Sequence, residues 1–510
     1  MRRDASFWLL LLLQVLLCYD FIRLDRSAEA KVNLRPIYWD VVSYYAYLPA
    51  LVVEGDLRLT FLDKPDRVHD RDLSHRYWPE ITPSGQRVIK TTMGVALMMS
   101  PFFGLAHLLA PYLGYTRNGF DRPYQMGAAL AGFFWGSLGL WLLRAWWLCL
   151  FGPWAVGLGL ILTVCATNLW NYLVYEPAMS HSFTFALMSL LLRSTHQTYL
   201  AWGLSEARRK HPLEGPTGVS SLWWPLGMAF SLGMLVLIRP TMALSGLIPL
   251  CYRSFDGIPG FLNGLCKRPL LSLSLILVAL LPWSLQSAYW LYSTGQWIFY
   301  SYQGEGFFWL DPRWREFLWS YRKGWLLYNP IAWTVVFAWF WAIASGLRNA
   351  FMRHTIKEAF PLATLLLMLL PLVVYVYSSW WCWWFGGSLG GRVMVDWYPL
   401  WATAALGMFH AVREDLRSWR PARWTTGVLV FALALGLGFC VALQRHQSWQ
   451  YKIALLHWDA TGQAWYRAVW WRSSFPSGLE GLAVSPDPEA ARKGKGREAE
   501  TWTLWTQGTP

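Results

Sequence analysis

Long apolar segments constrain this chain more than any other feature of its sequence. Only 15% of the 510 residues are charged, whereas a soluble domain carries about 25%. Several apolar runs approach or exceed the roughly 17–25 residues that a helix needs to cross a bilayer. They lie at residues 7–24, 124–148, 154–174, 182–200, 223–238, 270–289, 326–343, 361–377, 399–412 and 425–443. With one further short pass between residues 238 and 252, we expect an all-α polytopic membrane protein with about 11 transmembrane helices.

Basic residues lie mainly in short loops between the apolar runs and predict the orientation of the chain. Arg2 and Arg3, and the loops at 208–210, 267–268, 348–357 and 413–423, belong on the cytoplasmic side under the positive-inside rule. This placement accounts for the net charge of +14, and no motif of a nucleic-acid-binding fold is present, so we expect no nucleic-acid partner. The same orientation requires that residues 91–113 do not cross the membrane, so we expect this segment to lie in the outer interface or to re-enter the membrane from that side.

The same reasoning gives the expected organisation of the chain. Residues 1–445 form a transmembrane domain with two large non-cytoplasmic loops, at 25–123 and 290–325, which carry interfacial helices. Residues 446–484 form an outer C-terminal segment. Residues 485–510 contain an unpatterned run of Lys and Gly and are expected to be a disordered tail.

The first outer loop carries the most informative polar residue. Asp40 follows the first apolar run and is surrounded by aromatic residues, whose rings suit sugar faces: Tyr38, Trp39, Tyr44, Tyr45 and Tyr47. Transfer of a sugar from a lipid phosphate needs a base for the acceptor hydroxyl, cations for the phosphate and a platform for the sugar. Asp40 is the candidate base, and Tyr44 and Tyr45 are candidate sugar contacts. The alternative interpretation is that Asp40 caps a helix over residues 41–53.

A second group of polar residues is expected at the outer ends of later helices. Glu176 could assist Asp40 or share a divalent cation with it, such as Mg²⁺ or Mn²⁺. His181 could bind phosphate or take part in proton transfer, although a simple interfacial turn is the alternative. Arg239 is an isolated cation in an apolar run, so it is expected to contact a lipid phosphate or a structural ion-pair partner.

A dense motif of tryptophans and glycines occupies residues 378–399. Its glycines permit close backbone approach, and Arg392 can bind phosphate through two hydrogen bonds while Asp396 orients it. The tryptophans could hold a sugar or a prenyl chain; the candidates are Trp380, Trp381 and Trp384. An aromatic membrane belt is the alternative. Lys323 is a weaker phosphate candidate, for which a solvated loop charge is the other interpretation.

Taken together, these motifs resemble those of the bacterial membrane glycosyltransferases of the GT-C superfamily, relatives of the protein mannosyltransferases and of the aminoarabinose transferases of lipid A. The likeness covers roughly residues 5–445 and rests on WDVVSYYAYLPALVVEGDL, TTMGVALMMSPFF, TNLWNYLVYEPAMSHSFTF, LIRPT and WWCWWFGGSLGGRVMVDWYP. The resemblance implies an inverting transfer from a polyprenyl-phosphate sugar at the periplasmic face of the bacterial inner membrane. It matches Asp40 and Glu176 to the acidic residues of the first two outer loops. No second carboxylate adjoins Asp40, which leaves the metal open.

The expected partners are therefore the lipid-linked donor, membrane lipid, and a glycan, lipid or protein acceptor. One rival function is a transporter or flippase of lipid-linked sugars, which would favour inverted repeats with helices broken near the midplane. The polar motifs here cluster at one face instead. The other rival is a noncatalytic subunit of an envelope-assembly complex, which would not need an Asp, a Glu and two Arg at one level. A nucleotide-driven pump is disfavoured because no Walker A loop is present.

Overall fold

The computed structural model describes residues 4–26, 36–64, 75–204, 220–252, 257–351, 362–419 and 423–501. Within these ranges the chain is almost entirely helical, which confirms the predicted α-helical class; the strands β1 (Glu80–Ile81) and β2 (Arg87–Val88) form one short antiparallel hairpin. The chain divides into two compact units. Unit 1 contains residues 1–10, 151–171 and 304–510, and unit 2 contains residues 11–150 and 172–303.

Long apolar helices support the expected membrane location. Among the described residues, five helices are long and apolar enough to cross a membrane: Ala5–Arg23, Gly94–Leu113, Arg122–Trp147, Pro269–Thr294 and Gly427–Lys452. Shorter apolar helices cover Pro153–Cys165, Leu222–Ile238, Pro240–Cys251, Pro330–Ala344 and Ala363–Ser379. These helices indicate an integral membrane protein, whereas the count of about 11 spans stays a prediction. The segment Gly94–Leu113 is long enough to cross, so its expected interfacial placement also stays a prediction.

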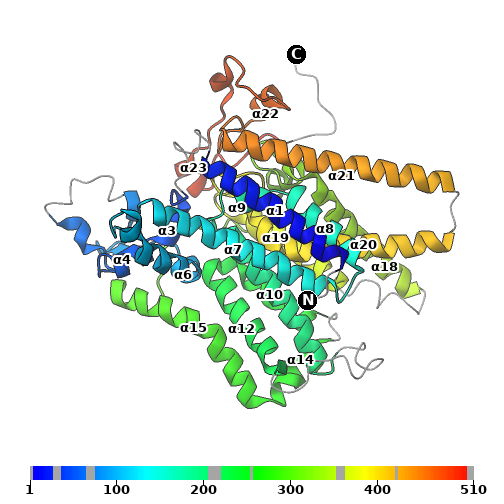
Figure 1. Cartoon of the computed structure of the whole chain (residues 1–510), viewed down its shortest axis with the longest axis horizontal. Coiled ribbons are helices and arrows are strands. Elements are labelled where there is room, and N and C mark those ends of the chain that lie inside the picture. The colour runs from blue at the N-terminus through cyan, green and yellow to red at the C-terminus, as the bar shows by residue number, and fades with distance from the viewer. Residues whose placement is uncertain are drawn as a thin grey trace. The chain divides into compact units, whose positions relative to one another are not determined.

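Unit 2 is built around a row of packed helices in which α7 packs on α10, α10 on α12 and α12 on α15, while α6 lies against α7 (Figure 1). Its elements are α3 (Asp40–Tyr45), α4 (Tyr47–Val52), η1 (Thr60–Asp63), α6 (Gly94–Leu109), η2 (Ala110–Leu113), α7 (Arg122–Trp147), α10 (Ser180–Ala201), α12 (Ser220–Ile238), η3 (Pro240–Gly246), α13 (Leu247–Cys251), α14 (Gly257–Cys266) and α15 (Pro269–Thr294). The chain passes between the units four times, and two of these points lie within α1 (Ala5–Arg26) and α9 (Leu169–Val174).

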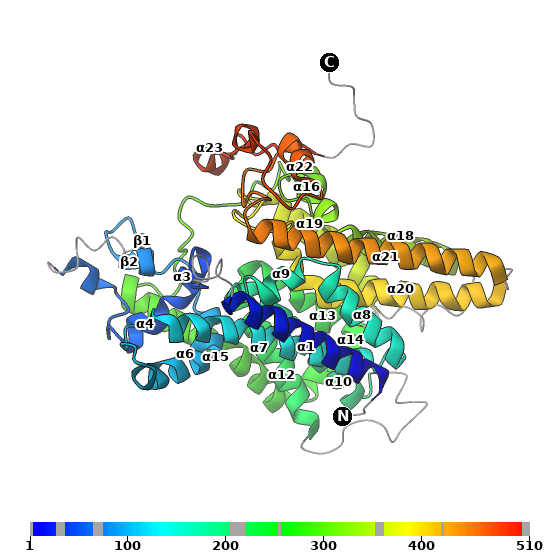
Figure 2. The same cartoon turned by 45° about the horizontal axis from the view of Figure 1, so that its top comes forward.

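Unit 1 combines long apolar helices with a folded C-terminal segment. Helix α18 packs on α19 and α20, and α8 contacts both α20 and α21; the long helices α20 and α21 run in a similar direction (Figure 2). The elements are α8 (Pro153–Cys165), α16 (Trp314–Trp319), α17 (Trp325–Tyr328), η4 (Pro330–Ala332), α18 (Trp333–Phe351), α19 (Ala363–Ser379), η5 (Arg392–Trp397), α20 (Tyr398–Trp419), α21 (Arg423–Lys452), α22 (Gln463–Val469), η6 (Leu479–Leu482) and α23 (Pro488–Arg492).

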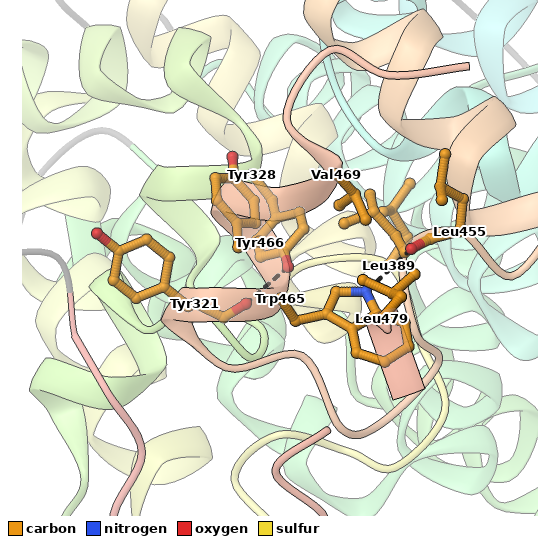
Figure 3. Packing of buried hydrophobic residues seen from close by; sticks show 9 residues of the cluster. Tyr321, Tyr328, Leu389, Leu455, Trp465, Tyr466, Val469 and Leu479 are labelled. Carbon is orange, nitrogen blue, oxygen red and sulfur yellow. Dashed lines mark hydrogen bonds between the residues drawn. The ribbon is translucent and has the colours of Figure 1, made fainter. Parts of the chain in front are cut away.

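A compact hydrophobic cluster joins residues 321–328 to the C-terminal segment within unit 1 (Figure 3). Tyr328 packs edge-on against Tyr466 at a ring separation of 5.5 Å and donates a 2.7 Å hydrogen bond to the carbonyl of Tyr321. The indole of Trp465 donates to the carbonyl of Leu455 at 2.9 Å. Buried aromatic rings with satisfied polar atoms are typical of a specific core, so the C-terminal segment is a folded part of unit 1.

The expectation of a disordered tail is wrong for residues 485–501. This stretch contains α23, which Asp487 caps by accepting hydrogen bonds from the backbone N–H groups of Glu489 and Ala490. Further on, the side chain of Arg497 is completely buried. Composition predicted disorder because the segment is polar and basic, but a single buried guanidinium anchors it. Residues 502–510 lie outside the described part of the chain.

Candidate functional site

Asp40 lies at a sharp turn rather than at a helix cap. A hydrogen bond from the N–H of Val41 to the carbonyl of Tyr38, 3.1 Å long, closes a four-residue turn with Trp39 at its second position. Asp40 is half-buried and is the first residue of α3, with no side-chain capping bond at this helix end. The helix-cap interpretation of Asp40 and the single helix over residues 41–53 are therefore both wrong, since α3 ends at Tyr45 and α4 begins at Tyr47.

The hydroxyl of Tyr38 connects this turn to the second predicted carboxylate. It donates a hydrogen bond to Oε1 of Glu176 at 3.0 Å, across 138 residues of sequence. The negative charge of Glu176 is the main cause that raises the pKa of Tyr38, followed by burial and by the hydrogen bond itself, and Asp40 adds to the shift. Both carboxylates thus act on one phenol, which stays a neutral hydrogen-bond donor. Asp40 and Glu176 belong to the same part of unit 2.

The turn that carries Glu176 is fixed by close contact with α7. A Cβ atom added to Gly132 would lie 1.7 Å from the carbonyl oxygen of Pro177, so only glycine allows the helix and the turn to approach this closely. The N–H of Met179 also bonds the carbonyl of Glu176 at 3.1 Å. The backbone position of Glu176 is therefore set by packing within unit 2.

Arg239, Ser180 and His181 form a small polar cluster beside the same turn. Arg239 donates to the hydroxyl of Ser180 from Nε at 3.3 Å and from Nη2 at 3.0 Å, and its Nη2 lies 3.3 Å from Nε2 of His181. A guanidinium can only donate, so Nε2 of His181 is the acceptor and the imidazole is neutral with its proton on Nδ1. Its ring lies 4.6 Å from that of Tyr172. The cluster therefore places one cation next to a neutral histidine.

The two tyrosines predicted to contact a sugar are buried. Tyr44 is 7% exposed and Tyr45 only 1%. The hydroxyl of Tyr45 donates to the carbonyl of Gly119 at 2.6 Å, and its ring packs edge-on against Phe103. Neither ring presents a free face, so their expected role as sugar contacts finds no support in this geometry. The sequence could not distinguish them from their neighbour Tyr38, because all of these aromatic residues stand within one short run.

Unit 1 holds the tryptophan and glycine motif in a tightly packed arrangement. Trp381 and Trp384 are buried and Trp380 is half-buried. Gly391 has a φ of 53°, and an added Cβ would lie 2.8 Å from the Cβ of Trp325. Asn168 donates to the carbonyl of Gly390 at 2.5 Å, which ties the motif to the end of α8. The glycines of this motif allow other groups to approach the backbone closely, as expected, and the groups that approach are side chains of the protein itself.

The predicted cations of unit 1 are buried. Arg392 is 8% exposed, and its Nη1 donates to the carbonyl of Gly387 at 3.4 Å; Asp396 is fully buried in the same 3₁₀ helix. Lys323 is 3% exposed, and its ammonium donates to the carbonyls of Ser388 and Trp458, so the solvated-charge interpretation is wrong. The orientation of Arg392 by Asp396 stays a prediction.

Sequence reasoning missed the neighbours of Lys323. Arg322 is 4% exposed, lies 5.3 Å above the ring of Trp384 and has a pKa lowered by burial. Burial also raises the pKa of Asp459, although the charges of Lys323 and Arg322 oppose this shift. No pattern in the sequence links these residues, because Asp459 joins the others only through the fold of the C-terminal segment.

An apolar pocket of about 80 Å³ lies among α8, α18, α20 and α21 in unit 1. Trp325, Tyr398 and Trp401 are part of its wall, together with aliphatic side chains of the four helices. Trp380, Trp381 and Trp384 are not among its lining residues, so the predicted prenyl pocket at these tryptophans does not coincide with this cavity.

A metal site is not apparent from side-chain clustering. Within the described ranges, no group of three or more His, Cys, Asp and Glu residues converges. Mg²⁺ commonly uses one or two carboxylates and takes its other ligands from water and substrate phosphate. Asp40 and Glu176 fit that smaller requirement, so a divalent cation shared by them stays a prediction.

Comparisons with known proteins give one structural similarity. No protein-family model matches the chain, and no curated protein matches its sequence. The structure is similar to that of the archaeal oligosaccharyltransferase AglB from Archaeoglobus fulgidus in complex with an inhibitory peptide and a dolichol-phosphate, with a TM-score of 0.45 and 11% identity. The match covers 98% of this chain but only 61% of the length of that structure. At this level of similarity the likeness does not define the activity of this chain.

Proposed function

We propose that this protein is an inverting membrane glycosyltransferase that moves a sugar from a polyprenyl-phosphate donor to an acceptor hydroxyl. The active site would face the non-cytoplasmic side, which is the periplasm if the membrane is a bacterial inner membrane. The acceptor would be a glycan, a lipid or a protein. The proposal rests on the residues of unit 2 and on their chemistry.

The hydrogen bond between Tyr38 and Glu176 is the observation that carries the proposal. It brings together the first outer loop and the turn before α10, which the sequence separately predicted as the two acidic parts of a transferase site. Its length of 3.0 Å and the influence of Asp40 on the same phenol mean that two carboxylates share one location.

Inversion at the sugar carbon requires one displacement, in which the acceptor oxygen attacks as the phosphate leaves. Asp40 would accept the proton of the acceptor hydroxyl during this attack. Tyr38 would hold one oxygen of Glu176 and so orient this carboxylate toward the acceptor or a divalent cation. Such a cation would neutralise part of the charge of the donor phosphate.

Departure of the phosphate requires positive charge in place before the bond breaks. Arg239 would supply it, because its guanidinium is already oriented by Ser180 and by the neutral ring of His181. His181 would then act through its position rather than as a charged group. Arg392 and Lys323 remain proposed phosphate contacts, and Trp380, Trp381 and Trp384 remain proposed contacts for sugar or prenyl groups; each can be tested by substitution.

The test is transfer by the purified full-length protein in nanodiscs with a panel of polyprenyl-phosphate sugars and candidate acceptors. Wild type should transfer, whereas Asp40→Asn should lose at least about 100-fold in rate, since general-base catalysis contributes roughly 10²–10⁴. Asp63→Asn is the matched control, because Asp63 lies in the same loop, with a side chain that is 58% exposed and pairs with Arg87.

The outcomes separate the proposed function from its rivals. Donor binding without turnover in wild type, together with movement of the donor across the bilayer, would replace the transferase by a flippase. If the wild-type protein binds neither the donor nor the acceptor, the result would favour the noncatalytic subunit of an envelope-assembly complex. Equal activity of wild type and a folded Asp40→Asn would retain the transferase and remove Asp40 as the base.

A further inference from the structure

Two exposed tryptophans beside Asp40 form an aromatic corner. Trp39 is 66% exposed and Trp78 is 43% exposed. Their ring centroids are 6.2 Å apart and their planes meet at 68°. They come from different parts of the first outer loop, so their pairing is a result of the fold and not of adjacency in the sequence.

Both tryptophans have a backbone conformation that normally belongs to glycine. Trp39 has φ 47° and ψ −129°, and Trp78 has φ 40°. A bulky residue at positive φ is strained, and such residues persist where the surrounding structure fixes them. At Trp39 the turn from Tyr38 to Val41 fixes the backbone. At Trp78 the preceding Tyr77 is fully buried and packs on Phe61, which turns the next side chain outwards.

The corner lies next to the groups assigned to catalysis. Trp39 stands between Tyr38, which bonds Glu176, and Asp40, the proposed base. An indole presents a flat apolar face, and the C–H face of a pyranose ring matches it in size and polarity while the sugar hydroxyls remain free for hydrogen bonds. Carboxylates close to such a ring in the chain are suitable partners for those hydroxyls.

We propose that Trp39 and Trp78 form a carbohydrate platform that holds a pyranose ring beside Asp40. This inference rests on the proposed function, because it assigns the platform to a substrate of the same site. The ring belongs either to a glycan acceptor or to the sugar of the lipid-linked donor. The stacking chemistry is the same in both cases, and the experiment below distinguishes them.

A membrane-anchoring role explains less of the geometry. A tryptophan that anchors a protein in lipid headgroups needs only an exposed ring at the interface. It does not need a fixed angle to a second ring or a strained backbone at both positions. Charged residues also stand next to this corner in the chain: Asp40 directly follows Trp39, and Glu80, which pairs with Lys90 at 3.6 Å, lies two residues after Trp78. A sugar ring satisfies both the apolar faces and these polar neighbours.

The test measures sugar binding directly, without turnover. Full-length protein in nanodiscs is examined by saturation-transfer NMR with methyl glycosides of glucose, galactose, mannose and N-acetylglucosamine, and with a short-chain prenyl-phosphate sugar. Trp39→Leu and Trp78→Leu each remove a ring, and Trp39→Gly removes a ring while suiting the local φ. Trp223→Leu is the matched control, because Trp223 is 68% exposed on α12 in the same unit.

The expected result is that wild type binds at least one probe and that each platform variant weakens this binding about tenfold, as the loss of one stacking contact predicts. Trp223→Leu should bind like wild type. If the methyl glycosides are affected, the platform serves the acceptor; if only the prenyl-phosphate sugar is affected, it serves the donor. In transfer assays the KM of that substrate should rise more than kcat falls, opposite to Asp40→Asn.

Three results would overturn the platform. They are no binding of any probe by wild type, unchanged binding in a folded Trp39→Gly, and variants that alter only reconstitution into lipid, as membrane anchors would. The proposed function is judged separately. Probe binding that depends on Trp39 without any transfer would support the platform and exclude the transferase. Transfer that is unchanged by substitution of Trp39 or Trp78 would support the transferase and exclude the platform.

Discussion

Replacing Arg497 by alanine should detach residues 485–501 from the rest of unit 1. The guanidinium is fully buried and donates to the backbone carbonyls of Trp381, Asp311, Ser378 and Trp380 at 3.0–3.3 Å, and also to Oδ2 of Asp311 at 3.2 Å. The carboxylate of Asp311 is 50% exposed, so solvent screens that part of the interaction. The backbone carbonyls are therefore the main partners that the substitution would leave unsatisfied.

The size of the effect follows from these partners. A hydrogen bond to a charged group contributes about 1.5–3 kcal/mol, but burial of the guanidinium opposes part of the sum. Each buried acceptor left without its donor costs about 1–3 kcal/mol, and because four carbonyls lose theirs with only partial relaxation, we expect Arg497→Ala to cost about 3–5 kcal/mol. The contact of the guanidinium with the ring of Phe308, at 4.6 Å, adds to the loss.

Limited proteolysis and thermal unfolding in detergent measure this loss. In Arg497→Ala the region around α23 should be cleaved much faster than in wild type, and the unfolding midpoint should fall. Lys493→Ala is the control, because Lys493 is exposed in the same stretch of chain. Equal protection in the Arg497→Ala and Lys493→Ala variants would refute the anchoring role of Arg497.

Three further predictions concern the site, its framework and pH. Tyr38→Phe removes the donor to Glu176 and should lower the transfer rate about tenfold with little change in stability; an unchanged rate would show that the bond does not orient the carboxylate. Gly132→Ala places a methyl group 1.7 Å from the carbonyl oxygen of Pro177, so it should shift the turn, reduce transfer and cost about 1–3 kcal/mol of stability, while a midpoint equal to wild type would contradict this packing. Burial, and then the charge of a nearby lysine, lower the pKa of His457, so the folded state favours the neutral ring. The stability from His457 should be present above about pH 6.5 and be lost as the pH falls below it, and the wild-type midpoint should drop between pH 7.5 and 5 more than that of His457→Asn; parallel curves would exclude this role.

Much of the candidate site was visible in the sequence as separate pieces. Asp40 and Glu176 were recognisable because a carboxylate at the end of an apolar run is costly unless it is used or hydrated. Their relation was not recognisable, since the hydrogen bond from Tyr38 spans 138 residues and depends on how α7 packs against the turn after α9. Local patterns report which residues can act, whereas long-range packing decides which of them meet.

The solvent exposure of individual aromatic side chains was the property of the candidate site that the sequence predicted least well. Tyr45 and Trp39 stand in the same aromatic run, yet Tyr45 is 1% exposed and Trp39 is 66% exposed. The difference arises because the backbone turns sharply at Trp39 before α3 begins. Trp78, its partner in the aromatic corner, attracted no attention in the sequence because a single tryptophan among 37 carries no pattern.

Hydrophobic length and isolated charges are local properties of a chain, so the helical class, the membrane-type helices and the candidate polar residues could be predicted from the sequence. Tertiary structure alone decided that Lys323 and Arg497 are buried on backbone carbonyls, that residues 485–501 are folded, and that Tyr38 joins the two acidic segments. Such pairings depend on loop closure over more than a hundred residues, and their free energy comes from contacts that no local pattern encodes.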